Sequence, residues 1–331
     1  LVAGTNAGED LASGGTYNIF IGEDAGKNVT TGDNSVAIGK GALQTSDTEG
    51  SNVAIGYEAL RDHNSGNSNV AIGYQAAYYC DGHSSVTAIG AYALGKPSSG
   101  STLWSTAVGS GAMLASEGWG CTAVGKDAVD GSNSSANYNT GVGYQAIHDV
   151  SSGEGNSALG ASAGKGCGSG AYNVFLGYNA GNNTLSTGDN CILIGKNSEP
   201  SSASVDNEIT LGNSDTATLR CNTQTISSLS DARDKTDINQ LELGLDFIDS
   251  LKPVKFKWQT RDGNSKDGSY EAGFIAQDFQ EIQKDNDADY LGLVMDENPE
   301  RLEASYGKLV PILVKAIQEL KQEIEELKNN G

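Results

Sequence analysis

The sequence has few aromatic and few basic side chains. Its 331 residues include only three Trp and six Phe, and Lys and Arg together number 21 against 42 Asp and Glu. The resulting net charge of -21 would repel nucleic-acid phosphates and an anionic membrane surface, so we expect no nucleic-acid partner. The scarcity of large aromatics beside 44 Gly argues against a single aromatic-rich core.

Long apolar runs and metal-binding patterns are also missing. No stretch reaches the roughly 18 apolar residues that would cross a bilayer, so we expect no membrane insertion. The five cysteines are odd in number and form no CxxC pair, and with three His they match no structural zinc spacing. We therefore expect no metal, no cofactor, and buried, reduced thiols from a protein made in a cytoplasm.

A short apolar phrase that ends in glycine recurs along most of the chain. It has the form apolar-small-apolar-Gly, as in Val53-Ala54-Ile55-Gly56. The glycines stand 16 to 19 residues apart, at positions 22, 39, 56, 73, 90, 109, 125, 143, 160, 177, 195 and 212. A repeat of about 17 residues is too short for two helices but fits short strands and tight corners. It predicts a parallel β-solenoid over residues 1–212.

Both faces of each predicted strand are apolar. The residues one and three places before the glycine are mostly Ile, Val, Leu or Thr, and the middle residue is Ala in seven copies. Because alternate side chains point to opposite faces, we assign the larger residues to the solenoid interior. The small middle residues, such as Ala54 and Ala71, are then expected to face sister chains, since a thin coil buries only one face by itself.

The phrases Asn34-Ser35-Val36-Ala37-Ile38-Gly39 and Asn52-Val53-Ala54-Ile55-Gly56 resemble the head repeat of trimeric autotransporter adhesins. That repeat forms a left-handed β-roll of three chains and also occurs in phage tail fibres, so the resemblance implies a homotrimer. Because Gly4 and Ala7 fit the same template, we expect more repeats before residue 1. Through that part a tail fibre would contact other tail proteins.

The composition changes after the repeats. Residues 1–229 hold 37 of the 44 glycines, and charged residues become denser beyond them. We interpret 213–229 as a neck or linker and 230–331 as a small α+β domain. Its expected elements are a helix within 241–251, a strand at 254–258, a strand that runs into a helix at 270–277, and a final helix.

The final helix carries an apolar seam. Steps of three and four separate Val310, Leu313, Ile317, Leu320, Ile324 and Leu327. This heptad spacing predicts a coiled coil in which Ile317, Leu320, Ile324 and Leu327 hold the trimer together. The alternative is that the stripe packs into the core of its own domain.

The C-terminal segment resembles the intramolecular chaperone of phage tail spikes and tail fibres. The resemblance runs from Ser230-Asp231-Ala232-Arg233-Asp234-Lys235 through Pro253-Val254-Lys255-Phe256-Lys257-Trp258 and Gly273-Phe274-Ile275-Ala276-Gln277 to the final helix. Members of this endosialidase-type family promote trimer formation and then cut themselves off. The resemblance implies cleavage of the Leu229-Ser230 bond by a Ser230–Lys235 pair, with Asp231 and Arg233 as further motif residues.

The residue types suit that chemistry. A serine hydroxyl is a weak nucleophile until a base removes its proton, and a lysine is a base only where burial or nearby cations lower its pKa. Backbone amides or Arg233 would stabilise the oxyanion. We expect an intramolecular serine autopeptidase without activity on other substrates.

The two resemblances together imply a phage tail fibre in the virion tail that binds a host-surface glycan or protein. One alternative is a bacterial trimeric surface adhesin. Another is a glycan-degrading tail spike, which needs two carboxylates at one cleft, whereas Asp24, Glu58 and Asp127 stand at scattered copies of the repeat.

Overall fold

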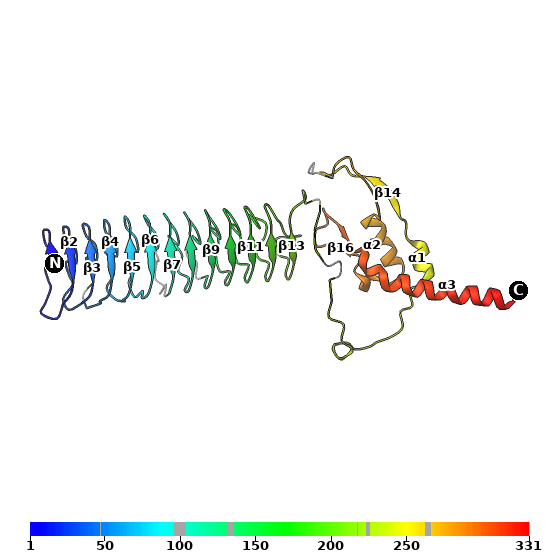
Figure 1. Ribbon diagram of the computed structural model, residues 1–331, viewed down its shortest axis with the longest axis horizontal. Coiled ribbons are helices and arrows are strands. Elements are labelled where there is room, and N and C mark those ends of the chain that lie inside the picture. Colours follow the sequence, from blue (N-terminus) through cyan, green and yellow to red (C-terminus); the bar gives the residue numbers. More distant parts are fainter. Residues whose placement is uncertain are drawn as a thin grey trace. The chain divides into compact units, whose positions relative to one another are not determined.

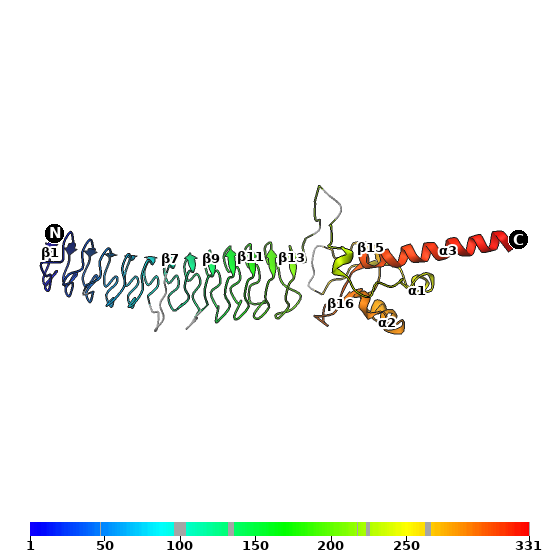
Figure 2. The same cartoon turned by 90° about the horizontal axis from the view of Figure 1, so that it is seen from below.

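The computed structural model describes residues 1–46, 48–95, 104–131, 136–216, 218–222, 226–261 and 266–330. The chain divides into two compact units, Leu1–Asn213 and Ser214–Gly331. The first unit is a β-solenoid of stacked turns, and the second is a small domain with short strands and helices (Figures 1 and 2). The predicted fold class, a parallel β-solenoid followed by an α+β domain, is confirmed.

Each turn of the solenoid contributes one short strand to a single parallel sheet. Within the described residues, thirteen strands follow one another in chain order. They are β1 Val2–Ala3, β2 Ile19–Ile21, β3 Val36–Ile38, β4 Val53–Ile55, β5 Val70–Ile72, β6 Thr87–Ile89, β7 Thr106–Val108, β8 Thr122–Val124, β9 Thr140–Val142, β10 Ser157–Leu159, β11 Val174–Leu176, β12 Ile192–Ile194 and β13 Ile209–Leu211. Each strand pairs with the next in register, so equivalent residues of successive repeats lie side by side.

The glycine that ends each phrase is required by the stacking of the turns. Gly56 has φ +135°, and a Cβ there would lie 2.3 Å from the carbonyl oxygen of Gly73 in the next turn. Its amide also donates to the carbonyl of Ile38 in the preceding turn at 2.8 Å. Only a residue without a side chain adopts this backbone while neighbouring turns approach so closely.

The middle residue of each strand points into the solenoid, which corrects our assignment of the two faces. Ala37, Ala54 and Ala71 are fully buried within the single chain, and Phe20 and Phe175 occupy the same position where Gly26 and Gly164 leave room for their rings. The interior between strand and corners is narrow, so it accepts alanine in most turns. The larger Val and Ile residues at the other two positions point outward instead.

An asparagine ladder fills the interior beside the alanines. Asn156, four residues before its glycine, accepts a hydrogen bond from the backbone N–H of Asn173 at 2.9 Å and donates to the carbonyl of Gly170 at 2.8 Å. Equivalent bonds are made by Asn18, Asn69, Asn139 and Asn173. These amides satisfy buried backbone groups where the chain turns into each strand. Sequence analysis missed this ladder, although the recurring Asn was its signal.

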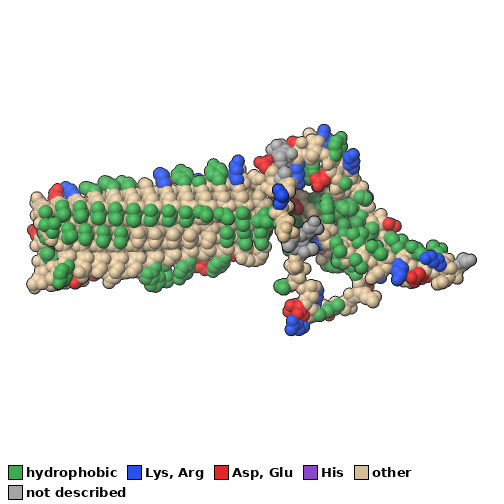
Figure 3. All heavy atoms as spheres, in the orientation of Figure 1, with side chains coloured by type: hydrophobic (Ala, Val, Ile, Leu, Met, Phe, Trp, Pro, Cys, Tyr) green, Lys and Arg blue, Asp and Glu red, His purple; other side chains and the backbone are tan. Residues whose placement is uncertain are grey.

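The outward residues form two apolar rows along the sheet, one and three places before each glycine. We call them the outer apolar rows, and Figure 3 shows hydrophobic side chains gathered in lines along this face of the solenoid. Val53 and Ile55 are half-buried, whereas Ile19, Leu159 and Leu176 are exposed. A continuous apolar surface of this kind marks a contact with another molecule.

Four of the five cysteines are buried in the solenoid, but Cys221 is exposed and corrects the expectation for that thiol. Burial raises the pKa of Cys121 to about 11 and that of Cys167 to about 12. It raises the pKa of Cys80 and Cys191 as well. These four thiols therefore stay protonated and unreactive near neutral pH.

We expect a thiol reagent such as Ellman's reagent to modify one cysteine, Cys221, in the folded protein at pH 8. All five should react after denaturation in guanidinium. Because the thiolate is the reactive form, the raised pKa of the buried thiols keeps them slow even as the pH rises toward 9. A Cys221→Ser variant is the control and should show no fast reaction. Fast labelling of more than one thiol in the native protein contradicts the burial.

The second unit is a small α+β domain. Its elements are η1 Ala232–Asp234, α1 Leu245–Ser250, β14 Val254–Lys257, β15 Tyr270–Gly273, α2 Ala276–Asp285, η2 Asp289–Leu291, β16 Val294–Met295, β17 Glu303–Ala304, η3 Tyr306–Leu309 and α3 Val310–Asn330. β14 pairs antiparallel with β15, and β16 with β17. The buried core joins α1, α2 and the start of α3 through Phe247, Phe279, Ile282, Leu293, Leu309 and Ile312.

Glu319 of α3 fixes the start of α1. The N-cap of α1 is Gly244, which has no side chain to cap the helix. The Glu319 carboxylate acts as the missing cap, because it accepts a hydrogen bond from the Leu245 N–H at 2.7 Å. It also forms an ion pair with Lys315 at 3.2 Å. The backbone bond from Leu245, followed by the Lys315 contact, lowers the pKa of Glu319. The first turns of α3 are therefore part of the folded domain.

Candidate functional site

A single turn of 3-10 helix brings Ser230 and Lys235 together. Asp231 caps this turn, η1, because its carboxylate accepts a hydrogen bond from the Arg233 N–H at 2.9 Å. The backbone N–H of Lys235 closes the turn on the carbonyl of Ala232 at 3.3 Å. A side-chain cap followed by one short turn therefore brings the ends of the six-residue motif close together.

The predicted nucleophile and base are in direct contact. The Lys235 Nζ donates a hydrogen bond to the Ser230 Oγ over 2.6 Å, and both residues are exposed in the single chain. A lysine within hydrogen-bond reach of a serine hydroxyl is the arrangement that a Ser-Lys pair requires. The bond would reverse its direction when a neutral amine accepts the hydroxyl proton. Leu229, on the other side of the bond to be cut, is fully exposed.

Asp231 and Arg233 pair with each other. The Arg233 Nε lies 3.0 Å from Asp231 Oδ1, and its Nη2 lies 2.6 Å from Oδ2. This bidentate bond lowers the pKa of Asp231 and raises that of Arg233. In the single chain the Arg233 guanidinium therefore binds the carboxylate of Asp231, the residue that caps η1. Its role here is to position the motif, while the oxyanion role suggested by the sequence stays a prediction.

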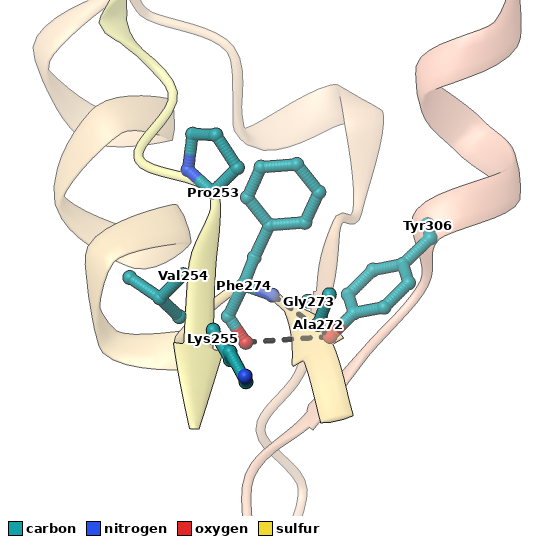
Figure 4. Close-up of a pocket in the computed structure, with 7 residues that line it drawn as sticks. All are labelled: Pro253, Val254, Lys255, Ala272, Gly273, Phe274 and Tyr306. Carbon is teal, nitrogen blue, oxygen red and sulfur yellow. Dashed lines mark hydrogen bonds between the residues drawn. The ribbon is translucent and has the colours of Figure 1, made fainter. Parts of the chain in front are cut away.

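A second feature of this domain is an apolar pocket beside the β14–β15 hairpin. It has a volume of about 470 Å³ and is lined by Pro253, Val254, Lys255, Ala272, Gly273, Phe274 and Tyr306. Figure 4 shows the Tyr306 hydroxyl bonded to the backbone of Phe274, where it accepts from the N–H at 3.1 Å and donates to the carbonyl at 3.3 Å. Two of the motifs that carry the chaperone resemblance line this pocket. Sequence analysis did not connect Tyr306 with them, because it is distant in the chain.

The seam of α3 lies on the side of the helix that faces away from its domain core. Ile312 and Ala316 are buried against the domain, whereas Ile317, Leu320, Ile324 and Leu327 are all exposed. The exposed fractions of Ile317 and Leu327 are 65% and 74%. The packing of the domain therefore leaves the predicted coiled-coil residues available for another helix.

In the part of the chain that the structure describes, no group of His, Cys, Asp and Glu is placed to hold a metal ion. No helix among those residues combines the length and the apolar character needed to span a bilayer.

The fold and the Ser230–Lys235 contact define a repeat-built β-solenoid protein with a separate C-terminal domain that carries a candidate nucleophile and base. Residues 230–288 match the family described as chaperone of endosialidase, and the match begins at Ser230. The second unit therefore contains an endosialidase-type chaperone domain. No curated protein and no solved structure matches the chain.

Proposed function

We propose that this protein is a bacteriophage tail fibre or tail spike whose C-terminal domain assembles three chains and then cuts itself from the solenoid. The observation that carries the proposal is the 2.6 Å contact between Lys235 Nζ and Ser230 Oγ at the first residue of the chaperone match. Host attachment, through a receptor on the cell surface, is the function of the assembled solenoid. Its site of action is the virion tail.

Two exposed apolar surfaces support assembly. The seam of α3 offers one contact for sister chains, and the outer apolar rows offer another along the solenoid. A repeat fold has many nearly equivalent registers, because neighbouring turns differ little. Helices that associate at one end raise the local concentration of the chains and fix their starting register. This order of events explains why the chaperone follows the solenoid in the chain.

The cleavage we propose proceeds in two steps. The Ser230 Oγ attacks the Leu229 carbonyl carbon, and Lys235 as a neutral amine takes the hydroxyl proton. The bond between that carbon and the Ser230 nitrogen breaks, the nitrogen takes a proton from Lys235, and an ester links Leu229 to Ser230 Oγ. Water then hydrolyses the ester, which leaves a Leu229 carboxylate and restores the hydroxyl of Ser230, whose amino group was freed when the ester formed. Assembly would favour the neutral lysine by removing the exposed pair from water.

Denaturing electrophoresis of the purified protein tests this proposal. We expect two fragments, and N-terminal sequencing of the smaller one should read Ser-Asp-Ala-Arg. Ser230→Ala and Lys235→Ala should each leave a full-length chain, because loss of a nucleophile or its base lowers the rate by about 1,000-fold or more. Both variants should still form trimers in light scattering.

Lys252→Ala is the matched control for charge, since this lysine lies outside the motif, and it should be cut like the wild type. Normal cleavage of Lys235→Ala refutes the assignment of the base. A correctly assembled wild-type trimer that stays whole refutes cleavage in this protein.

A further inference from the structure

One corner of the solenoid, five residues before each glycine, has a left-handed backbone. In most turns it holds residues that tolerate this conformation at low cost, such as Asn34 with φ 57° and Asn190 with φ 55°. In four turns the same position holds a large aromatic residue in the same conformation. These are Tyr17, Trp104, Tyr138 and Tyr172, with φ of 60°, 57°, 59° and 60°.

Bulky residues in this conformation are strained, and such strain persists where function requires the side chain. These side chains do not compensate by burial, because the exposed fractions of Trp104, Tyr138 and Tyr172 are 64%, 57% and 58%. Asn, Ser or Gly, which the other turns have at this position, would adopt the left-handed backbone with less strain. The three aromatic residues that recur in alternate turns, Trp104, Tyr138 and Tyr172, therefore point to a contact outside the coil, whereas Tyr17 stands alone near residue 1.

Trp104, Tyr138 and Tyr172 hold this position in alternate turns, with Gly120 and Gly155 in the turns between them, and Trp119 lies next to Gly120; we call these four aromatic residues the aromatic corner. The turn that carries Trp119 has Gly120 at the left-handed position, and Trp119 is 45% exposed. A Cβ on Gly120 would lie 2.9 Å from the ring of Tyr138, and one on Gly155 would lie 2.7 Å from the ring of Tyr172. These two tyrosine rings thus lie against glycine backbone.

Polar groups accompany the rings. The Tyr172 hydroxyl donates to Glu154 at 2.6 Å, and the Asn137 side-chain oxygen accepts from the backbone N–H of Trp119 at 3.0 Å. The negative faces of aromatic rings attract the polarised C–H groups of a sugar ring, and amides and carboxylates bind its hydroxyls. The charge of the chain, -21, disfavours an anionic ligand. Exposed rings, polar neighbours and negative charge together fit a neutral polysaccharide.

We propose that the aromatic corner binds a neutral bacterial surface polysaccharide, which names the receptor class for the attachment role proposed above and rests on that role. Successive turns lie about 4.8 Å apart, so Trp104, Tyr138 and Tyr172, which stand in alternate turns, recur about every 9.6 Å, and each ring can contact a separate part of one extended glycan.

Three substitutions to asparagine test the proposal without harming the coil. Trp104→Asn, Tyr138→Asn and Tyr172→Asn together restore the residue that other turns use at this backbone conformation, so thermal stability should hold or rise. The probes are an array of purified O-antigen and capsular polysaccharides, followed by titration of a bound neutral polysaccharide. Binding to wild type should change the fluorescence of Trp104 and Trp119, and the triple variant should bind about 30-fold more weakly.

Tyr17→Asn is the matched control, because it makes the same change at the same backbone conformation away from the aromatic corner, and it should bind like wild type. Unchanged binding by the triple variant overturns the inference, as does wild-type binding to anionic glycans alone or to none. A triple variant that loses its trimer also overturns the inference, because the aromatic corner would then be an interface between copies of the chain. Cleavage measured on the same samples separates the two proposals: if the chain assembles and cuts itself while the triple variant binds normally, only the glycan site is wrong.

Discussion

Replacing Ala54 with glutamate is expected to unfold the solenoid around β4. Ala54 is fully buried and stacks between Ala37 and Ala71 of the neighbouring turns. A glutamate there places an unpaired carboxylate in a space filled by methyl groups, with a loss of about 4 kcal/mol or more. Circular dichroism should show a lower melting temperature, and limited proteolysis should cut near this turn.

Ile55→Glu is the matched control one residue further along the same strand. Ile55 belongs to the outer apolar rows and is half-buried in the single chain. The charge should leave the β-sheet signal unchanged while it weakens association of the chains, which sedimentation measures. If Ala54→Glu keeps its stability, or if Ile55→Glu unfolds the protein instead, the assignment of the two faces is wrong.

The second large effect is expected at the seam of α3. Ile317→Gln, Leu320→Gln and Ile324→Gln together keep good helix formers but remove the apolar contact. Because all three side chains are exposed, the isolated domain should still fold. The full chain should give aggregated or monomeric repeats in light scattering, and Leu229-Ser230 should stay uncut.

Lys321→Gln and Glu325→Gln form the control for this variant. The two residues make an exposed ion pair on the same helix, 3.9 Å apart, and such surface pairs contribute little. The control should assemble like wild type. Soluble native trimers at full yield from the seam variant would refute the chaperone role of the helix. Substitution is a cleaner test than truncation, since removing α3 also removes Ile312 and Glu319, which hold the domain together.

The repeat could be predicted in detail because every turn needs a glycine at the same place, where the backbone of the next turn leaves no room for a side chain. The position of β4 follows from the phrase that ends at Gly56, and the in-register pairing follows from the period. The sequence did not predict which side chains of β4 point into the solenoid and which point outward. Both faces of β4 are apolar, and the rule that larger residues lie inside fails in a coil whose interior is narrow. The larger Val53 and Ile55 point outward, and their apolar character fits a surface covered by other chains.

The candidate site was predictable only in part, for a similar reason. Ser230 and Lys235 are recognisable as a motif, but their contact depends on the Asp231 cap and the short helical turn it begins. The pairing of Arg233 with Asp231 depends on the local backbone conformation, which the spacing of residues in the motif does not reveal. Tyr306 reaches the pocket beside β15 through the tertiary fold, since 32 residues separate it from Phe274.

The stacking of the turns also makes the length of the solenoid adjustable in units. Each turn is held by equivalent backbone bonds, and most turns place a small residue at the same interior position, so one repeat can be gained or lost while the remaining contacts are preserved. A deletion from Gly56 to the residue before Gly73 would shorten the coil by one turn, about 4.8 Å, and rejoin equivalent positions. Recombination between repeats would thus change the reach of the protein in discrete steps, without any redesign of its interior or of the domain that assembles it.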